Sequence, residues 1–275
     1  MRNIIFLFFT LIFIGCGGGG GSSDSSGSKS NNSVKKTITS SDKTVLLDDD
    51  FSKYQWHIKD TISNHDMGLI EIFTSSNYGY LGYNKGAPIL VQIVDDGIDS
   101  DHEDLKGNIN FESSYNDYFN TYGNPKPEDI ENNSHGTQVG GLISAVGYNN
   151  IGLKGVAPSS NLVSYTLETL NNSLLTSSTS LQRAWFTGTN ANNITVSNNS
   201  WSSCFDKDII GDEDFLKQGA ENLRDGKGRI YVFAAGNGRE GDDSCPNISN
   251  VDSSNTSYFH NSQYSIAVAG VTNDN

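Results

Sequence analysis

The sequence is short of basic residues and of proline. Eighteen Lys and Arg stand against 32 Asp and Glu, so the formal net charge is −14. Domains that bind nucleic acid carry clustered basic side chains, and this balance argues against that class. Five Pro against 29 Gly exclude Pro-rich and collagen-like chains. The acidic excess suits an exported protein that is soluble through its charge or that collects cations.

Long apolar runs are also missing. The run from Ile4 to Ile14 covers only eleven residues, whereas a membrane-spanning helix needs about 20. It follows the positive charge of Arg2 and fits the apolar region of a secretory signal. The run is followed by Gly15-Cys16, which resembles the lipobox of bacterial lipoproteins, with Phe13 in place of the usual Leu. That resemblance implies that Cys16 is lipidated and becomes the new N-terminus. Ordinary signal cleavage, with Cys16 incidental, is the alternative.

The chain is expected to divide into three segments: a lipoprotein-type signal peptide at 1–16, a tether at 17–43 and a folded domain at 44–275. The tether is rich in Gly, Ser and Asn, a composition typical of flexible spacers. A lipid anchor needs such a spacer to hold a domain off the membrane. We therefore expect an exported lipoprotein of the bacterial cell envelope that is anchored to the membrane, in a leaflet that the sequence does not specify.

Strand-like and helix-like segments alternate through the folded domain. Short apolar runs of the kind buried in parallel sheets occur at 89–94, 161–165, 194–197, 230–234 and 265–271. Helical patterns lie between them at 136–146, 180–186 and 213–224. The expected fold class is therefore α/β, a mostly parallel sheet with helices on both faces. Functional residues gather at the carboxyl ends of such strands.

Polar residues that a core does not need stand at these places. Asp95 and Asp96 end the most apolar strand, His135 opens the helix at 136–146, and Asn237 follows the strand at 230–234. Each has an ordinary explanation when taken alone: a solvated acidic turn, an exposed histidine and an Asn-Gly turn. Together they form a pattern that is much more specific than any single member.

The helix at 136–146 has two further features. Ser134 precedes it, and serine is a residue type that caps helices through its side chain. Gly140 and Gly141 lie inside it, although each glycine costs a helix up to about 1 kcal/mol relative to alanine. Their presence predicts that another part of the chain packs very closely against this helix.

The order Asp, then His, is the order found in subtilisin, and five motifs carry a wider likeness. All five resemble motifs of subtilisin-like serine proteases. They are Ile93-Val94-Asp95-Asp96-Gly97-Ile98, Ser134-His135-Gly136-Thr137, Gly155-Val156-Ala157-Pro158, Asn198-Asn199-Ser200-Trp201 and Ala234-Ala235-Gly236-Asn237-Gly238. The Asp-Asp-Gly form, with Gln55-Trp56-His57 upstream, resembles the kexin/furin branch. The resemblance runs from about residue 48 to residue 271.

The resemblance implies roles for single residues. Asp95 matches the triad aspartate, which orients the histidine and stabilises its cation. His135 matches the general base that accepts the proton of the serine. Asn237 matches the donor that stabilises the oxyanion, a contribution of about 2.7–4 kcal/mol in subtilisin.

The resemblance also implies a cleft for protein or peptide substrates. Ser200 and Trp201 would line it, and the backbone of residues 197–200 would pair with an extended peptide, as in other cases of strand addition. Asp96 matches the second acidic residue that the kexin branch uses near a basic side chain before the cut. Phe205 stands where that branch has a further acidic residue, so a strict preference for Arg or Lys is not expected.

A calcium site near the N-terminus is a further implication of the resemblance. Calcium prefers six to eight oxygens from carboxylates, amides and carbonyls. The matching ligands are two carboxylates, one amide and three backbone oxygens: Asp49, Asp104, Asn149, Val146, Ile151 and Leu153. Surface acid without a bound metal is the alternative.

Two cysteines remain in the folded domain, Cys204 and Cys245. An exported chain permits a disulfide between them. In the family resembled here, the strands before these residues border one cleft, so we expect the two sulfurs to bond. Closing this loop of about 40 residues would stabilise the fold by roughly 3–4 kcal/mol on the chain-entropy model.

The serine itself is the main departure. No Gly-Thr-Ser follows Asn237, so the nucleophile is expected beyond Asn275, with an exposed apolar face near the 265–271 strand. We therefore expect a calcium-dependent serine endopeptidase of which these 275 residues form an inactive fragment, incomplete at its C-terminus. The alternatives are a pseudoprotease that binds extended peptides and a calcium-binding surface lipoprotein.

Overall fold

The computed structural model describes residues 49–51, 54–58, 83–84, 87–170, 173–175, 177–201, 212–236 and 259–270. All of them lie in one compact unit, residues 37–275. The predictions for Cys16, Cys204, Cys245, Asn237 and Phe205, like those for the signal and the tether, fall outside the described residues. Within the described ranges, no helix has the length and apolar character that crossing a bilayer requires.

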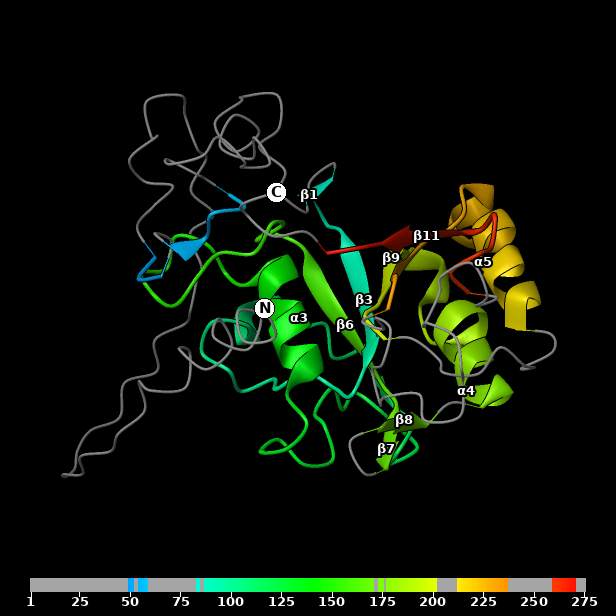
Figure 1. Ribbon diagram of the computed structural model, residues 1–275, viewed down its shortest axis with the longest axis horizontal. Coiled ribbons are helices and arrows are strands. Elements are labelled where there is room, and N and C mark those ends of the chain that lie inside the picture. Colours follow the sequence, from blue (N-terminus) through cyan, green and yellow to red (C-terminus); the bar gives the residue numbers. More distant parts are fainter. Residues whose placement is uncertain are drawn as a thin grey trace, which may run out of the picture. The chain divides into compact units, whose positions relative to one another are not determined.

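A seven-stranded sheet forms the centre of this unit, in the order β11-β10-β9-β3-β6-β4-β5 (Figure 1). Its strands are β3 (Leu90–Asp95), β4 (Tyr115–Asn116), β5 (Thr121–Tyr122), β6 (Asn161–Thr166), β9 (Ile194–Asn199), β10 (Ile230–Ala234) and β11 (Ser265–Val268). Its neighbouring strands run parallel except β4 and β5, which are antiparallel. The expected mostly parallel α/β sheet is confirmed, and each predicted strand lies within three residues of its observed bounds.

Two short antiparallel pairs lie outside this sheet. One joins β1 (Tyr83–Asn84) to β2 (Ala87–Pro88), and the other joins β7 (Glu168–Leu170) to β8 (Ser173–Leu175). Two single turns of 3-10 helix, η4 (Lys106–Asn108) and η6 (Ala191–Asn193), connect larger elements.

The main helices are α3 (His135–Ser144), α4 (Ser178–Gln182) and α5 (Asp212–Gly226). The helix predicted at 180–186 is in fact divided, because α4 continues into a turn of π-helix, η5 (Arg183–Thr187). α5 loses helical dihedral angles at Leu223, and Arg224 and Asp225 have positive φ values. The helical part therefore ends close to the predicted residue 224.

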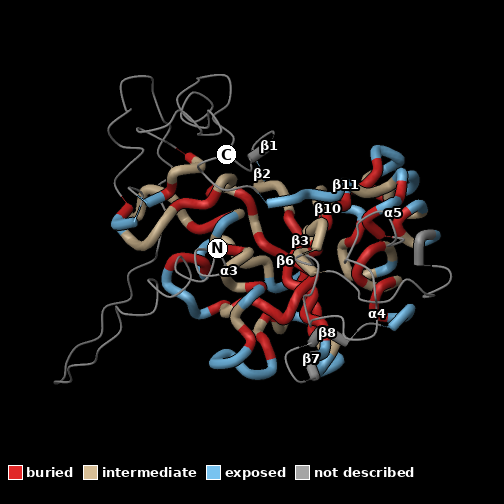
Figure 2. Tube along the Cα trace, in the orientation of Figure 1, coloured by how far each residue is buried: buried red, intermediate tan, exposed pale blue. Residues whose placement is uncertain are grey.

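Helices cover both faces of the sheet, and β3 shows how the sequence directs this. Side chains alternate between the two faces along a strand. Val91 and Ile93 pack in the core that also holds Val139 and Ile143 of α3, whereas Val94 packs in the core on the other face. Figure 2 shows β3 and β6 as buried along most of their length. The next residue on the α3 face after Ile93 is Asp95.

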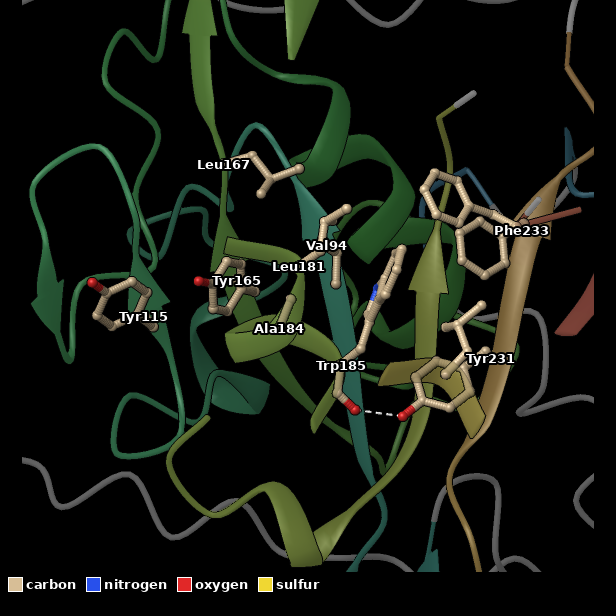
Figure 3. Close-up of a cluster of buried hydrophobic side chains, with 11 residues drawn as sticks. Val94, Tyr115, Tyr165, Leu167, Leu181, Ala184, Trp185, Tyr231 and Phe233 are labelled. Carbon is tan, nitrogen blue, oxygen red and sulfur yellow. Dashed lines mark hydrogen bonds between the residues drawn. The ribbon is translucent and has the colours of Figure 1, made fainter. Parts of the chain in front are cut away.

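The core on the other face is built around Trp185 of η5 (Figure 3). Trp185 is fully buried and meets Phe233 of β10 edge-on, with the ring centroids 5.7 Å apart. Its carbonyl oxygen accepts a hydrogen bond from the Tyr231 hydroxyl. Burying one such large side chain stabilises a fold by about 1.5–3 kcal/mol.

The outer strand β11 carries apolar side chains that the described residues leave uncovered. Ile266 is 54% exposed and Val268 is 52% exposed, and β11 is pale blue in Figure 2. Their partners in the register are Val232 and Ala234 of β10, which alternate with Tyr231 and therefore lie on the α3 face. An apolar strip of this sheet face thus lies beside the part that α3 covers.

Candidate active site

Asp95 and His135 meet where the end of β3 faces the start of α3. The His135 Nδ1 atom lies 2.9 Å from Asp95 Oδ1 and 3.0 Å from Asp95 Oδ2. The Asp95 side chain is 1% exposed, whereas the His135 side chain is 54% exposed. The ring is therefore held by a buried carboxylate on one side while part of it remains open to solvent.

The environment of His135 favours its protonated form. The hydrogen bond with Asp95 raises the pKa of His135 above its ordinary value of 6.5, burial opposes that rise, and the charges of Asp95 and Asp96 add to it. A histidine held in this way by a carboxylate can accept a proton at Nε2 and keep the resulting cation in place. This pair is the arrangement that the sequence predicted.

The close approach of α3 to β3 depends on Gly136. A Cβ atom built on Gly136 would lie 2.4 Å from the carbonyl oxygen of Gly97 and 3.0 Å from Asp95 Cβ. Such a contact with backbone cannot be relieved by turning a side chain. The prediction of close packing is confirmed for Gly140, where a Cβ would lie 3.2 Å from Leu162, but Gly141 faces open space.

Asp96, and not Ser134, caps α3. The Asp96 carboxylate accepts hydrogen bonds from the backbone N–H groups of His135, at 3.0 Å, and Gly136, at 2.7 Å. Ser134 makes no capping bond through its side chain, so the expectation for this residue is wrong. The carboxylate reaches the helix from 39 residues away in the sequence, a contact that local sequence rules cannot foresee.

Burial and the neighbouring charge of Asp95 raise the pKa of Asp96, while the two backbone hydrogen bonds oppose that rise. The carboxylate also lies at the positive end of the helix dipole, where negative charge is favourable. Holding the first turn of α3 in place is thus a role that the sequence did not reveal. The predicted contact of Asp96 with substrate stays a prediction.

Asp96→Ala is expected to lower the free energy of unfolding by about 1–2 kcal/mol, because it removes the cap of α3. Ser134→Ala is the matched control and should change the free energy of unfolding by less than about 0.5 kcal/mol, because Ser134 makes no capping bond. Urea unfolding of both variants measures the difference. Equal losses would show that the Asp96 bonds do not stabilise the helix.

The structure corrects part of the predicted substrate contact. β9 pairs with β10 on one side and with β3 on the other, and Ser197 has a partner on each. The backbone of Ser197 and Asn198 is therefore not an edge to which a peptide can add. Asn199 is paired with Phe233 of β10 only, so any such pairing has to begin at Asn199 or Ser200.

Trp201 is half-buried and supports the end of β3, while its predicted contact with substrate stays a prediction. Its indole N–H donates to the carbonyl oxygen of Val94 at 2.9 Å, and its ring stacks on Trp185 at 6.3 Å between centroids. The bond holds the strand end immediately before Asp95. This supporting contact was not predicted from the sequence.

The predicted calcium ligands do come together. Both oxygens of Asp49 accept backbone N–H groups from the loop after α3, those of Tyr148 and Asn149, at 3.1 Å each. Asn149 Nδ2 donates to Asp104 Oδ1 at 2.8 Å. Lys154, which the sequence analysis did not single out, places its Nζ atom 3.0 Å from Asp49 Oδ2. We call Asp49, Asp104, Tyr148, Asn149 and Lys154 the Asp49–Asp104 cluster.

These residues fit a calcium ion poorly. The three remaining predicted ligands, Val146, Ile151 and Leu153, lie on the same loop, but the Leu153 N–H donates to Asp104 Oδ2 at 3.1 Å and the Ile151 N–H donates to Asn149 Oδ1 at 2.9 Å. The side-chain oxygens of the predicted set thus already accept from N–H groups.

Comparison with known proteins gives the arrangement a context. A family model described as the subtilase family matches residues 86–275. Furin-1 of Xenopus laevis is 32% identical over 225 residues, which are 79% of this chain and 26% of that protein. Kexin of Saccharomyces cerevisiae is 30% identical over 233 residues, which are 82% of this chain and 25% of that protein. The chain thus spans about a quarter of the length of the curated relatives it matches.

Solved structures agree with the sheet described above. The chain is similar to the serine protease of Aeromonas sobria in complex with its chaperone, with a TM-score of 0.57 and 26% identity, over 69% of this chain and 32% of that one. The structure of the same protease alone gives a TM-score of 0.56 and 25% identity. A buried aspartate that orients a partly exposed histidine therefore lies in a fold shared with proteases.

Proposed function

Because this chain belongs to the subtilase family, we propose that the protein of which it forms part is a serine endopeptidase that cleaves peptide bonds in proteins. The observation that carries the proposal is the pair of Asp95 and His135, with both carboxylate oxygens within 3.0 Å of Nδ1. In a general-base mechanism, such a pair serves a nucleophile that must lose a proton. A module that only binds peptides has no need of it.

In this mechanism, His135 accepts the proton of a serine hydroxyl as the oxygen attacks the peptide carbonyl, and later gives a proton to the leaving amine. Asp95 keeps the ring in one tautomer by accepting from Nδ1 and stabilises the cation. The Asp96 backbone N–H also donates to Asp95 Oδ1 at 2.8 Å, which fixes the carboxylate in turn. Asn237 remains the proposed oxyanion donor.

We place the serine on a segment beyond Asn275. The uncovered strip on β10 and β11 supports this, because Ile266 and Val268 expose apolar area on the same sheet face as α3. A segment packed there would lie beside the helix that carries His135. This chain of 275 residues would then hydrolyse peptides no faster than a subtilisin without its serine, whose turnover is lower by a factor of about 2 × 10⁶.

The pH dependence of the full-length gene product tests this function. Deprotonated His135 is the active base, and its pKa is raised above 6.5. We therefore expect kcat/KM for casein peptides to fall about tenfold per pH unit below an inflection that lies above pH 6.5. A fluorophosphonate probe should label the serine with the same pH dependence.

The same shift fixes the sign for stability. Because the folded pKa is raised, the His135–Asp95 interaction stabilises the fold fully below pH 6.5, and this contribution is lost as the pH rises through the folded pKa. The proposed function would be contradicted if the full-length protein neither cleaved casein nor reacted with the probe at any pH.

A further inference from the structure

Lys154 is among the largest side chains with no exposed area. Its Nζ atom lies 3.0 Å from Asp49 Oδ2, and the Asp49 side chain is fully buried as well. The ammonium also stands 4.1 Å from the centre of the Tyr148 ring, within the range of a cation–π contact. A buried charge is tolerated only where it is compensated. The partners of Lys154 supply that compensation inside the Asp49–Asp104 cluster.

The oxygens of the cluster face N–H donors from several directions. Asp49 accepts from two backbone N–H groups and from the lysine, whereas Asp104 accepts from Asn149 Nδ2 on one oxygen and from the Leu153 N–H on the other. A calcium ion binds six to eight oxygens that turn toward it. An ion in the cluster would have to share these oxygens with the N–H donors, and at Asp49 Oδ2 it would compete with both the Tyr148 N–H and the Lys154 ammonium.

Space is limited on the Asp104 side. Gly152 has a φ of 56°, and a Cβ atom at this position would lie 2.5 Å from Asp104 Oδ2. The loop therefore closes directly over the carboxylate. Phe51, two residues after Asp49, donates its N–H to the Gly152 carbonyl oxygen at 2.7 Å and ties the N-terminal segment to the same turn.

We propose that the Lys154 ammonium is the resident cation of the Asp49–Asp104 cluster, and that this cluster therefore holds no calcium ion. An ion placed among these groups would meet a positive charge that is already buried against Asp49. The positive charge of Lys154 thus compensates the Asp49 carboxylate as a metal ion would. The ion pair also joins the segment at residues 49–51 to the loop after α3. The Lys126–Asp101 ion pair differs from the Lys154–Asp49 pair in exposure. It lies at the surface, with side chains that are 35% and 79% exposed.

The experiment compares the full-length protein with Lys154→Met, which keeps the length of the side chain and removes its charge. Thermal unfolding is followed in EGTA and in millimolar calcium, and bound calcium is counted by titration calorimetry. Terbium serves as a second probe, because an ion in the cluster would lie beside Tyr148 and its emission would be sensitised by that ring. Lys126→Met is the control for the loss of a Lys–Asp pair, and Asp104→Asn is the control for the cluster itself.

The wild type and the Asp104→Asn variant should bind the same number of calcium ions, because the cluster holds none in the wild type. Lys154→Met should have a lower melting temperature in EGTA, recover part of it in calcium, bind one more ion per chain than the wild type and gain terbium emission. That emission should disappear when Tyr148→Phe is added. Lys126→Met should behave as the wild type does.

Two results would overturn the proposal. One is calcium bound by the wild type and lost in Asp104→Asn, which needs no lysine variant to be folded. The other is a folded Lys154→Met protein that gains neither calcium nor terbium emission. Since every readout is binding or unfolding, failure of the proposed peptidase activity would leave the result unaffected.

Discussion

His135→Ala is expected to lower kcat of the full-length peptidase about 10⁶-fold, and Asp95→Asn about 10⁴-fold. His135 is the base, so its removal leaves the nucleophile protonated. The Asp95→Asn side chain would instead offer an amide N–H toward Nδ1, at a place where the carboxylate now lies 2.9 Å away. The ring would then carry its proton on Nε2, where the serine needs an acceptor.

Turnover of a peptide substrate, with the melting temperature measured in parallel, separates this loss from unfolding. His102→Ala is the matched control, because His102 is exposed and accepts a hydrogen bond from the Asp104 N–H without touching the pair. It should stay within about twofold of the wild type, a change of less than about 0.5 kcal/mol in the barrier. Asp95→Asn that kept a tenth of the wild-type kcat would contradict the role given to Asp95.

Gly136→Ala is expected to lower the free energy of unfolding by about 1–3 kcal/mol, the usual cost of forcing an extra methyl group into a packed site. The added methyl carbon would lie 2.4 Å from the Gly97 carbonyl oxygen, which is too close for non-bonded atoms. Relief requires α3 to move away from β3. We therefore expect kcat to fall as well, because His135 moves with the first turn of the helix.

Gly141→Ala, five residues further along the same helix, provides the contrast. Nothing lies within 4 Å of its added Cβ, so the change should stabilise the protein by up to about 1 kcal/mol through helix propensity alone. Urea unfolding and kcat of both variants measure the two effects. A loss of the same size at both positions would show that propensity, and not the contact with Gly97, governs Gly136.

Much of the site follows from the sequence because its residues obey short-range patterns. The apolar run at 89–94 defines a buried strand, and alternation along it places Asp95 on the face of Val91 and Ile93. The helical pattern that begins beside His135 places this ring at the first turn of a helix packed on that face. Two local periodicities, joined by the parallel βαβ connection, thus bring a carboxylate and an imidazole together.

The contacts that the sequence did not determine join residues whose proximity depends on which elements are neighbours. The cap of α3 comes from Asp96 at the end of a strand, and an adjacent Ser134 that satisfies the local rule makes no capping bond. Ser197 has no free backbone edge because β9 lies between β3 and β10 in the sheet.

Lys154 shows the same limit most clearly. In the sequence it is one lysine in the loop after the histidine helix, and the resemblance assigned the neighbouring residues to calcium. Only the fold brings its ammonium to Asp49, 105 residues away in the chain, where both side chains are fully buried. Periodicity in the sequence predicted the strands and the helix, since it encodes which face a side chain occupies, and the motifs that resemble subtilisin-like proteases predicted the Asp95–His135 pair. The tertiary structure decided which charges compensate one another, because burial and distance between remote segments exist only once the strands are ordered.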